Sequence, residues 1–384
     1  MGGRHGTMSA QKLQQHNILY LTCFANNGFG GQESLYYLVK HLDKNLFRPI
    51  VGLPWDGELR PRLSESAIDN TVVDLPKINP SNLKKIMRAF SNLGKLVRKR
   101  HVELIHTDSV RNTFYAGVIG RLANIPVVWH IRTSDHDRYD RLLYYLSTRI
   151  ITVADRLKSR FAWDAGRNGK IETIYNGVDP AKFCVQRTHS KIRNRYGIPG
   201  DDLLISVVAR IEPAKGQKYL IKAAEILKKN FQKFFIIFAG DIYDRSYMQE
   251  CRNAAEDCGL HGQVIFTGHL DCVNELLAET DIVVLPSIRS EGFPRAVIEG
   301  MTAGIPVIAT DIGGSPEAVS DLRTGFIVKP KDPFALAEKI LELGLDGSLR
   351  KKIGEQARSR AINLFGIQKN VDSIMNLYKR VLKI

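Results

Sequence analysis

Two glutamates, Glu291 and Glu299, lie in the stretch 289–317 and are separated by seven residues. Pro294 between them suits the first position of a helix, because a helix start leaves that N–H unpaired in any case. Glu291 would then precede the helix, and Glu299 would lie more than one turn inside it. Backbone N–H groups at a helix start suit a phosphate or a sugar hydroxyl, and carboxylates accept hydrogen bonds from sugar hydroxyls. This spacing is compatible with a nucleotide-sugar as the ligand.

A plainer interpretation of the two acids stays open. The helix dipole favours an acid before a helix, and an acid inside the helix can lie on a solvated face. The full string RSEGFPRAVIEGMTAGIPVIATDIGGSPE is more specific. It resembles the E-x7-E segment of the retaining glycosyltransferases of family 4 (glycosyl transferases group 1), which have the GT-B fold. The resemblance implies that Glu291, with the amides of Gly292 and Phe293, binds the donor sugar, and that Glu299 binds the ribose.

Arg210 and Lys215 form a second candidate group, on the loop that follows a predicted strand over 203–208. A guanidinium and an ammonium placed there can bind a diphosphate and stabilise the charge that develops as it departs. A solvated basic loop is the alternative. The string resembles the R-x4-K-G segment of the same family, which implies the diphosphate role. It also implies that the nucleotide base meets the backbone of Gly268 and Leu270.

A glycine-rich loop lies near the start of the chain. It joins a predicted strand over 17–23 to a predicted helix over 32–42 and contains Gly30 and Gly31. Strand, glycine loop and helix form an arrangement that can hold phosphate. Because residue 33 is Glu, the spelling differs from the dinucleotide fingerprint, and a tight turn is the alternative. The resemblance implies that Gly30 and Gly31 approach the donor phosphates across a cleft.

His106, His130 and Asn176 stand at the carboxyl ends of predicted strands, where parallel sheets bind ligands. The resemblance implies that His130 reaches the donor sugar, while a structural histidine is the alternative. His106 is a second candidate in or beside the acceptor cleft. Asn176 opens an NGVD string that resembles a turn of the family, and Asn-Gly is also an ordinary turn dipeptide.

Residues 135–137 spell Asp-His-Asp, a DxD sequence that carries a divalent metal in the GT-A fold. About one such match is expected by chance in a chain with this many aspartates. The GT-B resemblance implies that basic residues and helix dipoles neutralise the diphosphate, so we expect neither metal nor cofactor. The five cysteines, an odd number without a CxxC pair, argue against a zinc site and for a reducing compartment.

The arrangement of elements sets the expected fold. A chain of 384 residues is longer than one core usually holds. Its strand-like and helix-like segments alternate, which predicts parallel, doubly wound α/β sheets. Together with the resemblance, this predicts a GT-B fold of two Rossmann-like domains facing across a cleft. We expect an acceptor-binding domain over 1–183, a nucleotide-sugar-binding domain over 184–365, and a last helix over 366–384 that crosses back to the first domain.

Charge is distributed unevenly along the chain. The formal net charge is +15, of which residues 1–183 contribute +11 and residues 184–384 contribute +4. A basic first half indicates an anionic partner such as a lipid headgroup, a membrane surface or nucleic acid. No apolar run approaches the roughly 20 residues of a membrane span, and the N-terminus lacks a secretory core. We therefore expect a cytoplasmic protein, in peripheral contact with the inner face of the membrane if the basic half meets lipid.

The predicted helix over 81–101 carries much of that charge. An apolar stripe follows one side of it, and seven cations occupy much of the rest: Lys84, Lys85, Arg88, Lys95, Arg98, Lys99 and Arg100. One interpretation is a crossover helix with its cations in water. The other is a basic helix that docks on anionic lipid.

Taken together, the sequence predicts a retaining, metal-independent hexosyltransferase. It would move a sugar from a UDP- or GDP-sugar to a hydroxyl of a glycan or lipid-linked acceptor, in cell-surface polysaccharide or lipopolysaccharide synthesis. The acceptor hydroxyl would attack, with the departing phosphate oxygen as its base. Two alternatives stay open: a nucleotide-sugar epimerase on the same fold, and a non-enzymatic basic module that binds membrane or nucleic acid. The lack of an interleaved aromatic and basic patch argues against nucleic acid.

Overall fold

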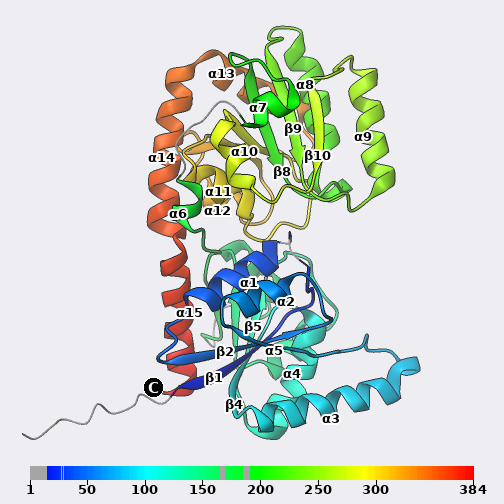
Figure 1. The fold of residues 1–384 in the computed structure, drawn as a ribbon, viewed down its shortest axis with the longest axis vertical. Helices are drawn as coiled ribbons and strands as arrows, with labels where there is room; N and C mark the ends of the chain where they lie inside the picture. The colour runs from blue at the N-terminus through cyan, green and yellow to red at the C-terminus, as the bar shows by residue number, and fades with distance from the viewer. Residues whose placement is uncertain (1–14, 27, 29, 165–168, 185–190) are drawn as a thin grey trace, which may run out of the picture.

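The computed structural model describes residues 15–26, 28, 30–164, 169–184 and 191–384. These residues form two α/β domains, one above the other in Figure 1. The N-terminal sheet has seven strands in the order β3-β2-β1-β4-β5-β6-β7, and the C-terminal sheet has six in the order β10-β9-β8-β11-β12-β13. Every pairing in both sheets is parallel. The predicted fold class is confirmed.

The central strands of the N-terminal sheet are mostly apolar, as expected for parallel strands covered on both faces, whereas the edge strands β3 and β7 are short and more polar. They are β1 (His16–Leu21), β2 (Phe47–Leu53), β3 (Asp69–Val72), β4 (Val102–Thr107), β5 (Val127–Ile131), β6 (Arg149–Thr152) and β7 (Ile171–Thr173). The helices of this domain are α1 (Gly30–His41), α2 (Leu59–Glu65), α3 (Leu83–Lys99), α4 (Val110–Ala123) and α5 (Asp140–Leu146), with the 3-10 segments η1 (Pro80–Asn82) and η2 (Asp155–Phe161).

The C-terminal sheet repeats the same alternation. Its strands are β8 (Leu203–Val208), β9 (Phe234–Ala239), β10 (Val264–Gly268), β11 (Ile282–Leu285), β12 (Val307–Thr310) and β13 (Gly325–Val328). Its helices are α7 (Lys191–Tyr196), α8 (Gln217–Lys228), α9 (Arg245–Asp257), α10 (Val273–Glu279), α11 (Arg295–Thr302), α12 (Ser315–Ala318), α13 (Pro333–Leu345) and α14 (Gly347–Phe365), with the 3-10 turn η3 (Pro213–Lys215). The short helix α6 (Pro180–Phe183) lies between the two domains along the chain.

The last helix, α15 (Ile367–Leu382), leaves the C-terminal domain and packs on the N-terminal one. In Figure 1, α14 runs beside the C-terminal domain and α15 continues beside α1. Val371, Ile374 and Leu377 are buried in the same cluster as the apolar side chains of β1 and α1. Ile367 donates its N–H to the carbonyl of Val178, 2.8 Å away, so the returning helix is tied to the segment between the domains.

The two domains share an apolar joint. One buried cluster contains Trp129 and Leu143 from the N-terminal domain together with Phe293 and Met301 from the C-terminal domain. The ring of Phe293 lies 4.8 Å from that of Tyr175 and 4.9 Å from that of Phe365, measured between centroids. Aromatic pairs at these separations are favourable beyond the area they bury. The joint therefore fixes the loop that carries Glu291 against the first domain.

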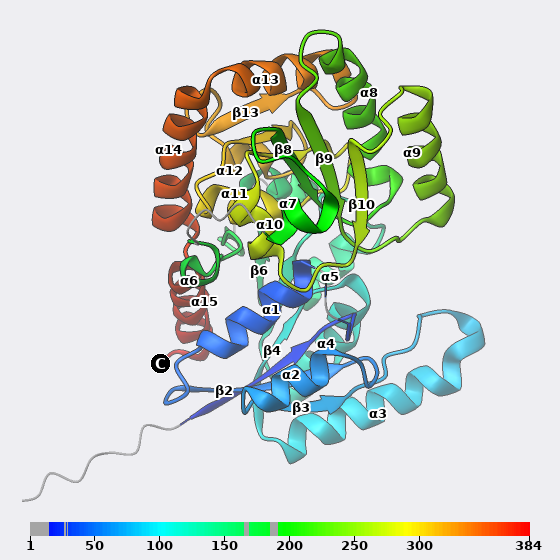
Figure 2. The same cartoon turned by 45° about the horizontal axis from the view of Figure 1, so that its top comes forward.

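The basic helix α3 lies on the outside of the N-terminal domain, at its edge in Figures 1 and 2. Ile86, Leu93 and Val97 are buried against the domain. Leu83 and Met87, part of the same apolar stripe, are 63% and 62% exposed. The stripe is therefore wider than the core requires at the start of this helix. No helix of the described ranges combines the length and the apolar character needed to cross a bilayer.

Candidate active site

A cavity of about 720 Å³ lies between the domains, at the carboxyl ends of strands from both sheets. Most of the site residues predicted from the sequence line it: Gly30, Gly31, Arg210, Lys215, Leu270, Glu291, Gly292, Phe293 and Glu299. Gly268 and His130 do not line it. Residues from the two halves of the chain, more than 250 positions apart in sequence, thus line opposite walls of one cavity.

Glu291 and Lys215 meet on the C-terminal wall. The ammonium of Lys215 donates to Oε1 of Glu291 over 2.6 Å, and the hydroxyl of Ser287 donates to the same oxygen over 2.6 Å. The Glu291 loop is packed closely, because a Cβ on Gly313 would lie 2.1 Å from the carbonyl oxygen of Glu291. A buried carboxylate with a half-buried ammonium beside it is an ion pair that a charged ligand can separate.

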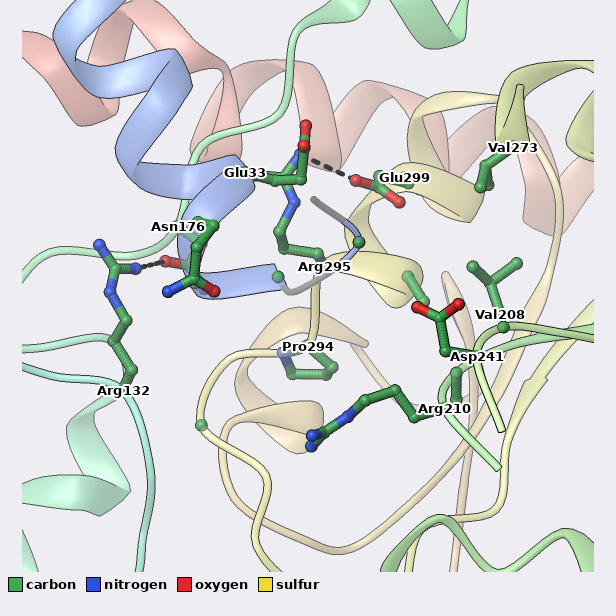
Figure 3. Close-up of a pocket in the computed structure, with 18 of the residues that line it drawn as sticks. Glu33, Arg132, Asn176, Val208, Arg210, Asp241, Val273, Pro294, Arg295 and Glu299 are labelled. Carbon is green, nitrogen blue, oxygen red and sulfur yellow. Dashed lines mark hydrogen bonds and ion pairs between the residues drawn. The ribbon is translucent and has the colours of Figure 1, made fainter. Parts of the chain in front are cut away.

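Arg210 follows the end of β8 and points into the cavity below Pro294 (Figure 3). Its guanidinium lies 2.9 Å from Oε1 of Glu212 and 4.7 Å from the centre of the Tyr243 ring. The loop from Arg210 to the start of α8 passes close to β11: Gly216 has φ +68°, and a Cβ there would meet the carbonyl oxygen of Pro286 at 2.1 Å. This turn needs glycine, and it presents both cations to the same cavity.

Glu299 is held by a residue that the sequence reasoning did not single out. Arg295 donates to Oε1 of Glu299 over 2.8 Å, as Figure 3 shows, and to the carbonyl of Gly177 over 2.9 Å. A Cβ on Gly30 would lie 3.5 Å from Cδ of Arg295, so the glycine loop packs directly on this side chain. Its four-residue spacing from Glu299, the spacing of helical ion pairs, is a signal that could have found it. The helix α11 starts at Arg295, with Pro294 as its N-cap, one residue later than the sequence pattern indicates.

Arg132 and Asn176 form the facing wall. Arg132 donates to the side-chain oxygen of Asn176 over 3.1 Å (Figure 3). The amide of Asn176 donates to the carbonyl of Phe293 over 2.8 Å. A Cβ on Gly31 would lie 3.5 Å from Cδ of Arg132. Burial lowers the pKa of Arg132, and the nearby charge of Arg295 lowers it further. Asn176 therefore links the first domain to the loop of the second domain that carries Glu291 and Phe293.

His130 lies outside the lining of the cavity. It is 2% exposed, does not line the cavity, and its Nδ1 lies 3.1 Å from Nε2 of His106. Nδ1 of His106 in turn lies 2.6 Å from the hydroxyl of Tyr378 on α15. Burial, with the charge of Arg132 as a smaller cause, lowers the pKa of His106 to about 3 and holds that of His130 well below its ordinary value. Both rings are buried and neither lines the cavity, so the contact of His130 with a sugar stays a prediction.

Gly268 is also set back from the cavity. It ends β10 with φ +70°, and its carbonyl accepts a hydrogen bond from the N–H of Gly240 over 2.9 Å. The wall near it is formed instead by His269, Leu270 and Asp241. The contact of a base with the backbone at Gly268 and Leu270 stays a prediction, and of the two residues Leu270 lines the cavity.

The DxD sequence has structural partners. Asp135 accepts a hydrogen bond from the hydroxyl of Ser290 over 3.0 Å, and Asp137 accepts one from the N–H of Tyr139 over 2.9 Å. Among the residues that the structure describes, no group of three or more His, Cys, Asp or Glu could hold a metal ion. The five cysteines are all free thiols.

Gly292, in the loop that carries Glu291, lies very close to the first domain. A Cβ there would lie 2.0 Å from the carbonyl oxygen of Arg132 and 3.0 Å from Cγ2 of Val153. We expect Gly292→Ala to push the loop away and to cost about 1 to 3 kcal/mol of stability, as overpacking does. Melting temperature and nucleoside diphosphate affinity should both fall. The matched control is Gly200→Ala, where a Cβ meets nothing within 4 Å; equal melting temperatures for the two variants would contradict this close packing.

Comparison with known families covers most of the chain. Residues 29–182 match the family model Glycosyltransferase Family 4, and residues 188–360 match the model Glycosyl transferases group 1. A glycosyltransferase of Methanocaldococcus jannaschii is 27% identical over 300 residues, covering 75% of this chain and 71% of the relative. A UDP-Gal:alpha-D-GlcNAc-diphosphoundecaprenol alpha-1,3-galactosyltransferase of Escherichia coli is 26% identical, covering 77% of this chain and 80% of that protein.

Solved structures resemble the fold over nearly its whole length. A glycosyltransferase from Rickettsia africae superposes with a TM-score of 0.86 at 23% identity, covering 96% of this chain and 99% of that one. Anabaena HepE in complex with UDP-glucose superposes with a TM-score of 0.82 at 23% identity, covering 95% and 99%. At 23% identity, these similarities show a shared fold and nothing more specific.

Proposed function

Because this chain belongs to the glycosyltransferases, with a Family 4 N-terminal half and a group 1 C-terminal half, we propose that it moves a sugar from a nucleotide-sugar to a hydroxyl with retention of configuration. The observation that carries the proposal is the meeting of Arg210, Lys215 and Glu291 on one wall of the cavity between the domains. Two cations suit a diphosphate, and the carboxylate beside them suits the hydroxyls of the sugar attached to it.

The donor lies along the C-terminal wall in this proposal. Arg210 and Lys215 bind the diphosphate and stabilise the charge that develops on it as it departs. Glu291, relieved of Lys215, accepts hydrogen bonds from the sugar, with the amides of Gly292 and Phe293 beside it. Glu299 binds the ribose through the carboxylate that Arg295 orients by Oε1. Gly30 and Gly31 close the phosphate side, where they pack beside Arg295 and Arg132.

The reaction replaces one bond at the anomeric carbon with another on the same face. The bond from that carbon to the phosphate oxygen breaks, and the bond to the acceptor oxygen forms. The proton of the acceptor hydroxyl passes to the departing phosphate oxygen, so the protein supplies no nucleophile. The cations of Arg210 and Lys215 do the work of a metal in this scheme, and we propose that turnover needs no divalent ion.

The donor is proposed to be a hexose linked to UDP or GDP. Relatives of this chain carry names that include UDP-Gal and GDP-mannose, and HepE was solved with UDP-glucose. Thermal melting with a panel of UDP-, GDP- and ADP-sugars tests this. A true donor at a hundred times its dissociation constant should stabilise the fold by about 2.7 kcal/mol. If none of the panel raised the melting temperature, the donor site would be refuted.

The acceptor is proposed to be a glycan or lipid-linked hydroxyl that approaches from the N-terminal domain, in cell-surface polysaccharide or lipopolysaccharide synthesis. This domain carries most of the positive charge. It also exposes Leu83 and Met87 among the cations of α3, which is the pattern of a helix that enters a lipid interface. We therefore propose peripheral contact with an anionic membrane through α3.

Vesicle binding tests the membrane contact. We expect the protein to bind vesicles that contain phosphatidylglycerol and to lose that binding as salt is added, because each cation near the surface contributes about 1 kcal/mol. Leu83→Ser with Met87→Ser should weaken the binding several-fold. Leu345→Ser is the matched control, since Leu345 is 69% exposed on the other domain. If the double variant bound as tightly as the control, α3 would not be the contact.

The alternative that the protein is a nucleotide-sugar epimerase can be distinguished from transfer by the reaction products. An epimerase acting on a nucleotide-sugar would convert it without any acceptor and would form no glycoside. A transferase releases nucleoside diphosphate in equal amount to the glycoside that it forms. Product analysis with and without an acceptor therefore decides between the two.

A further inference from the structure

A second cavity, of about 790 Å³, lies at the other edge of the N-terminal sheet. Pro126, Thr148 and Lys170 line it, and they directly precede the strands β5, β6 and β7. Because these strands are parallel, their amino ends meet at the edge opposite the cavity between the domains. Val381 and Lys383, at the end of α15, also line the second cavity. The two cavities share none of the residues that the structure describes.

The lining of the second cavity is strongly positive. It contains four cations, Arg121, Arg149, Lys170 and Lys383, and none of its described residues is acidic. The helices α4 and α5 both end at this cavity, and each helix C-terminus carries about half a negative charge. Two such ends offset only one of the four positive charges, which leaves a net charge of about +3.

The properties of Lys170 indicate that these cations lie close together. Burial lowers the pKa of its ammonium, and the charges of Arg121 and Arg149 lower it further. Asp164 acts in the other direction, but it is buried, does not line the cavity and accepts a hydrogen bond from Tyr144 over 2.7 Å. A half-buried ammonium beside two guanidinium groups is unfavourable unless an anion balances their charge.

The backbone orients both arginines at this cavity. Arg121 donates to the carbonyl of Tyr145, and Nη1 of Arg149 donates to the carbonyl of Thr148 over 3.1 Å. Each of these contacts uses one of the five N–H donors of a guanidinium. One interpretation is that the cations only neutralise the two helix ends, which requires no ligand. The excess of positive charge over those ends favours a bound anion instead.

We propose that this cavity binds a phosphate group, with Arg121, Arg149 and Lys170 as its hydrogen-bond donors and Lys383 beside them. A guanidinium matches two phosphate oxygens, and the net charge suits the roughly two negative charges of a phosphate monoester. The group belongs either to a soluble phosphorylated compound or to a lipid headgroup. Tyr145 lines the cavity and is 61% exposed, so the rim offers apolar surface to a lipid. The site is separate from the proposed transfer reaction and does not depend on it.

Labelling of Lys170 with pyridoxal 5′-phosphate tests the site in the full-length protein. The aldehyde condenses with the lysine amine and releases water, borohydride reduces the imine, and peptide mass spectrometry measures every lysine separately. 5′-Deoxypyridoxal is the comparison, because it carries the same aldehyde without a phosphate. We expect the phosphate to accelerate labelling of Lys170 about 10-fold more than labelling of the exposed Lys329, the effect of one charged hydrogen bond. Equal acceleration at the two lysines would overturn the proposal.

Competition identifies the source of the phosphate. Sodium pyrophosphate, or vesicles of phosphatidylcholine with phosphatidic acid, are added before the label. Protection of Lys170 by pyrophosphate alone would support a soluble ligand, and protection by the vesicles would support a lipid headgroup. Protection by neither would overturn the proposal. Because each lysine is measured separately, labelling of Lys215 in the donor cavity does not enter the result.

Two variants test the role of the cations. Arg121→Gln combined with Arg149→Gln should abolish both the preference for phosphate at Lys170 and the protection. Lys383→Gln, at the end of the chain, should lower that preference several-fold, even if the double variant folds poorly. Lys379→Gln is the matched control, because Lys379 lies in the last turn of the same helix and does not line the cavity. A wild-type preference for phosphate in both test variants would overturn the proposal.

Discussion

When Lys215 is replaced by alanine, we expect turnover of every accepted donor to fall about 10²- to 10³-fold, the usual effect of removing one group that stabilises charge in the transition state. Arg210→Ala should act in the same direction. Both cations line the cavity from the same loop, and a departing diphosphate needs positive charge where its own charge develops. The effect should appear in kcat as well as in kcat/KM, because the charge is greater in the transition state than in the bound donor.

The Lys215→Ala variant needs a stability control, because it leaves the carboxylate of Glu291 buried without its ammonium. Breaking a buried pair in this way typically costs about 3 to 5 kcal/mol. Lys215→Ala combined with Glu291→Gln should recover much of the melting temperature and none of the turnover. Lys218→Ala is the matched surface control, since its ion pair with Glu250 is more exposed. Unchanged turnover in both Arg210→Ala and Lys215→Ala would refute the proposal that these two residues bind the diphosphate.

Glu291→Ala should reduce kcat to a similar extent, about 10²-fold or more, because the sugar loses the carboxylate that positions it. The same substitution should have the opposite effect on the affinity for free nucleoside diphosphate. Lys215 loses the partner that neutralises it at 2.6 Å, so free nucleoside diphosphate should bind as tightly as before or more tightly.

This split is measured by calorimetric titration of the nucleoside diphosphate beside steady-state kinetics with the full donor. Glu212→Ala provides a comparison on the same wall, since Glu212 pairs with Arg210. A Glu291→Ala variant that lost diphosphate and sugar affinity in equal measure would show that Glu291 acts only by supporting the fold of the loop.

The fold could be predicted because its signals are local. Apolar runs such as VVWHI and IVVL alternate with amphipathic segments, and this pattern is sufficient for two parallel sheets. The strand-end rule then places the loops that carry Arg210 and Glu291 at one edge. Their roles came from longer strings, RIEPAKG and the E-x7-E segment, in which glycines stand where the structure leaves no room for a Cβ.

The burial of His130 away from the cavity has a geometric cause. His106 and His130 both face the side of the sheet that α15 covers, where Tyr378 meets His106 across 272 positions of sequence. Strand ends mark the edge of a sheet, and they do not say whether a side chain lies beyond that edge or under a helix. Arg132, two residues further on, has passed the end of β5 and lines the cavity instead. A helix that returns from the other end of the chain leaves no local signal at His130.

Arg295 was missed although its ion pair with Glu299 has a local signal in the sequence. Arg295 stands beside Pro294 in a helix start that attracted attention for its acids, so its ion pair with Glu299 was overlooked.

The stereochemistry of the first-formed product tests the central claim most directly. The protein is incubated with the donor that raises its melting temperature and with an octyl glycoside acceptor, and the anomeric configuration of the new bond is read by NMR before any rearrangement. The account predicts an α-linked glycoside from an α-configured donor, with one nucleoside diphosphate released for each glycoside formed. A β-linked product would contradict retention, and an altered nucleotide-sugar without diphosphate release would contradict transfer itself.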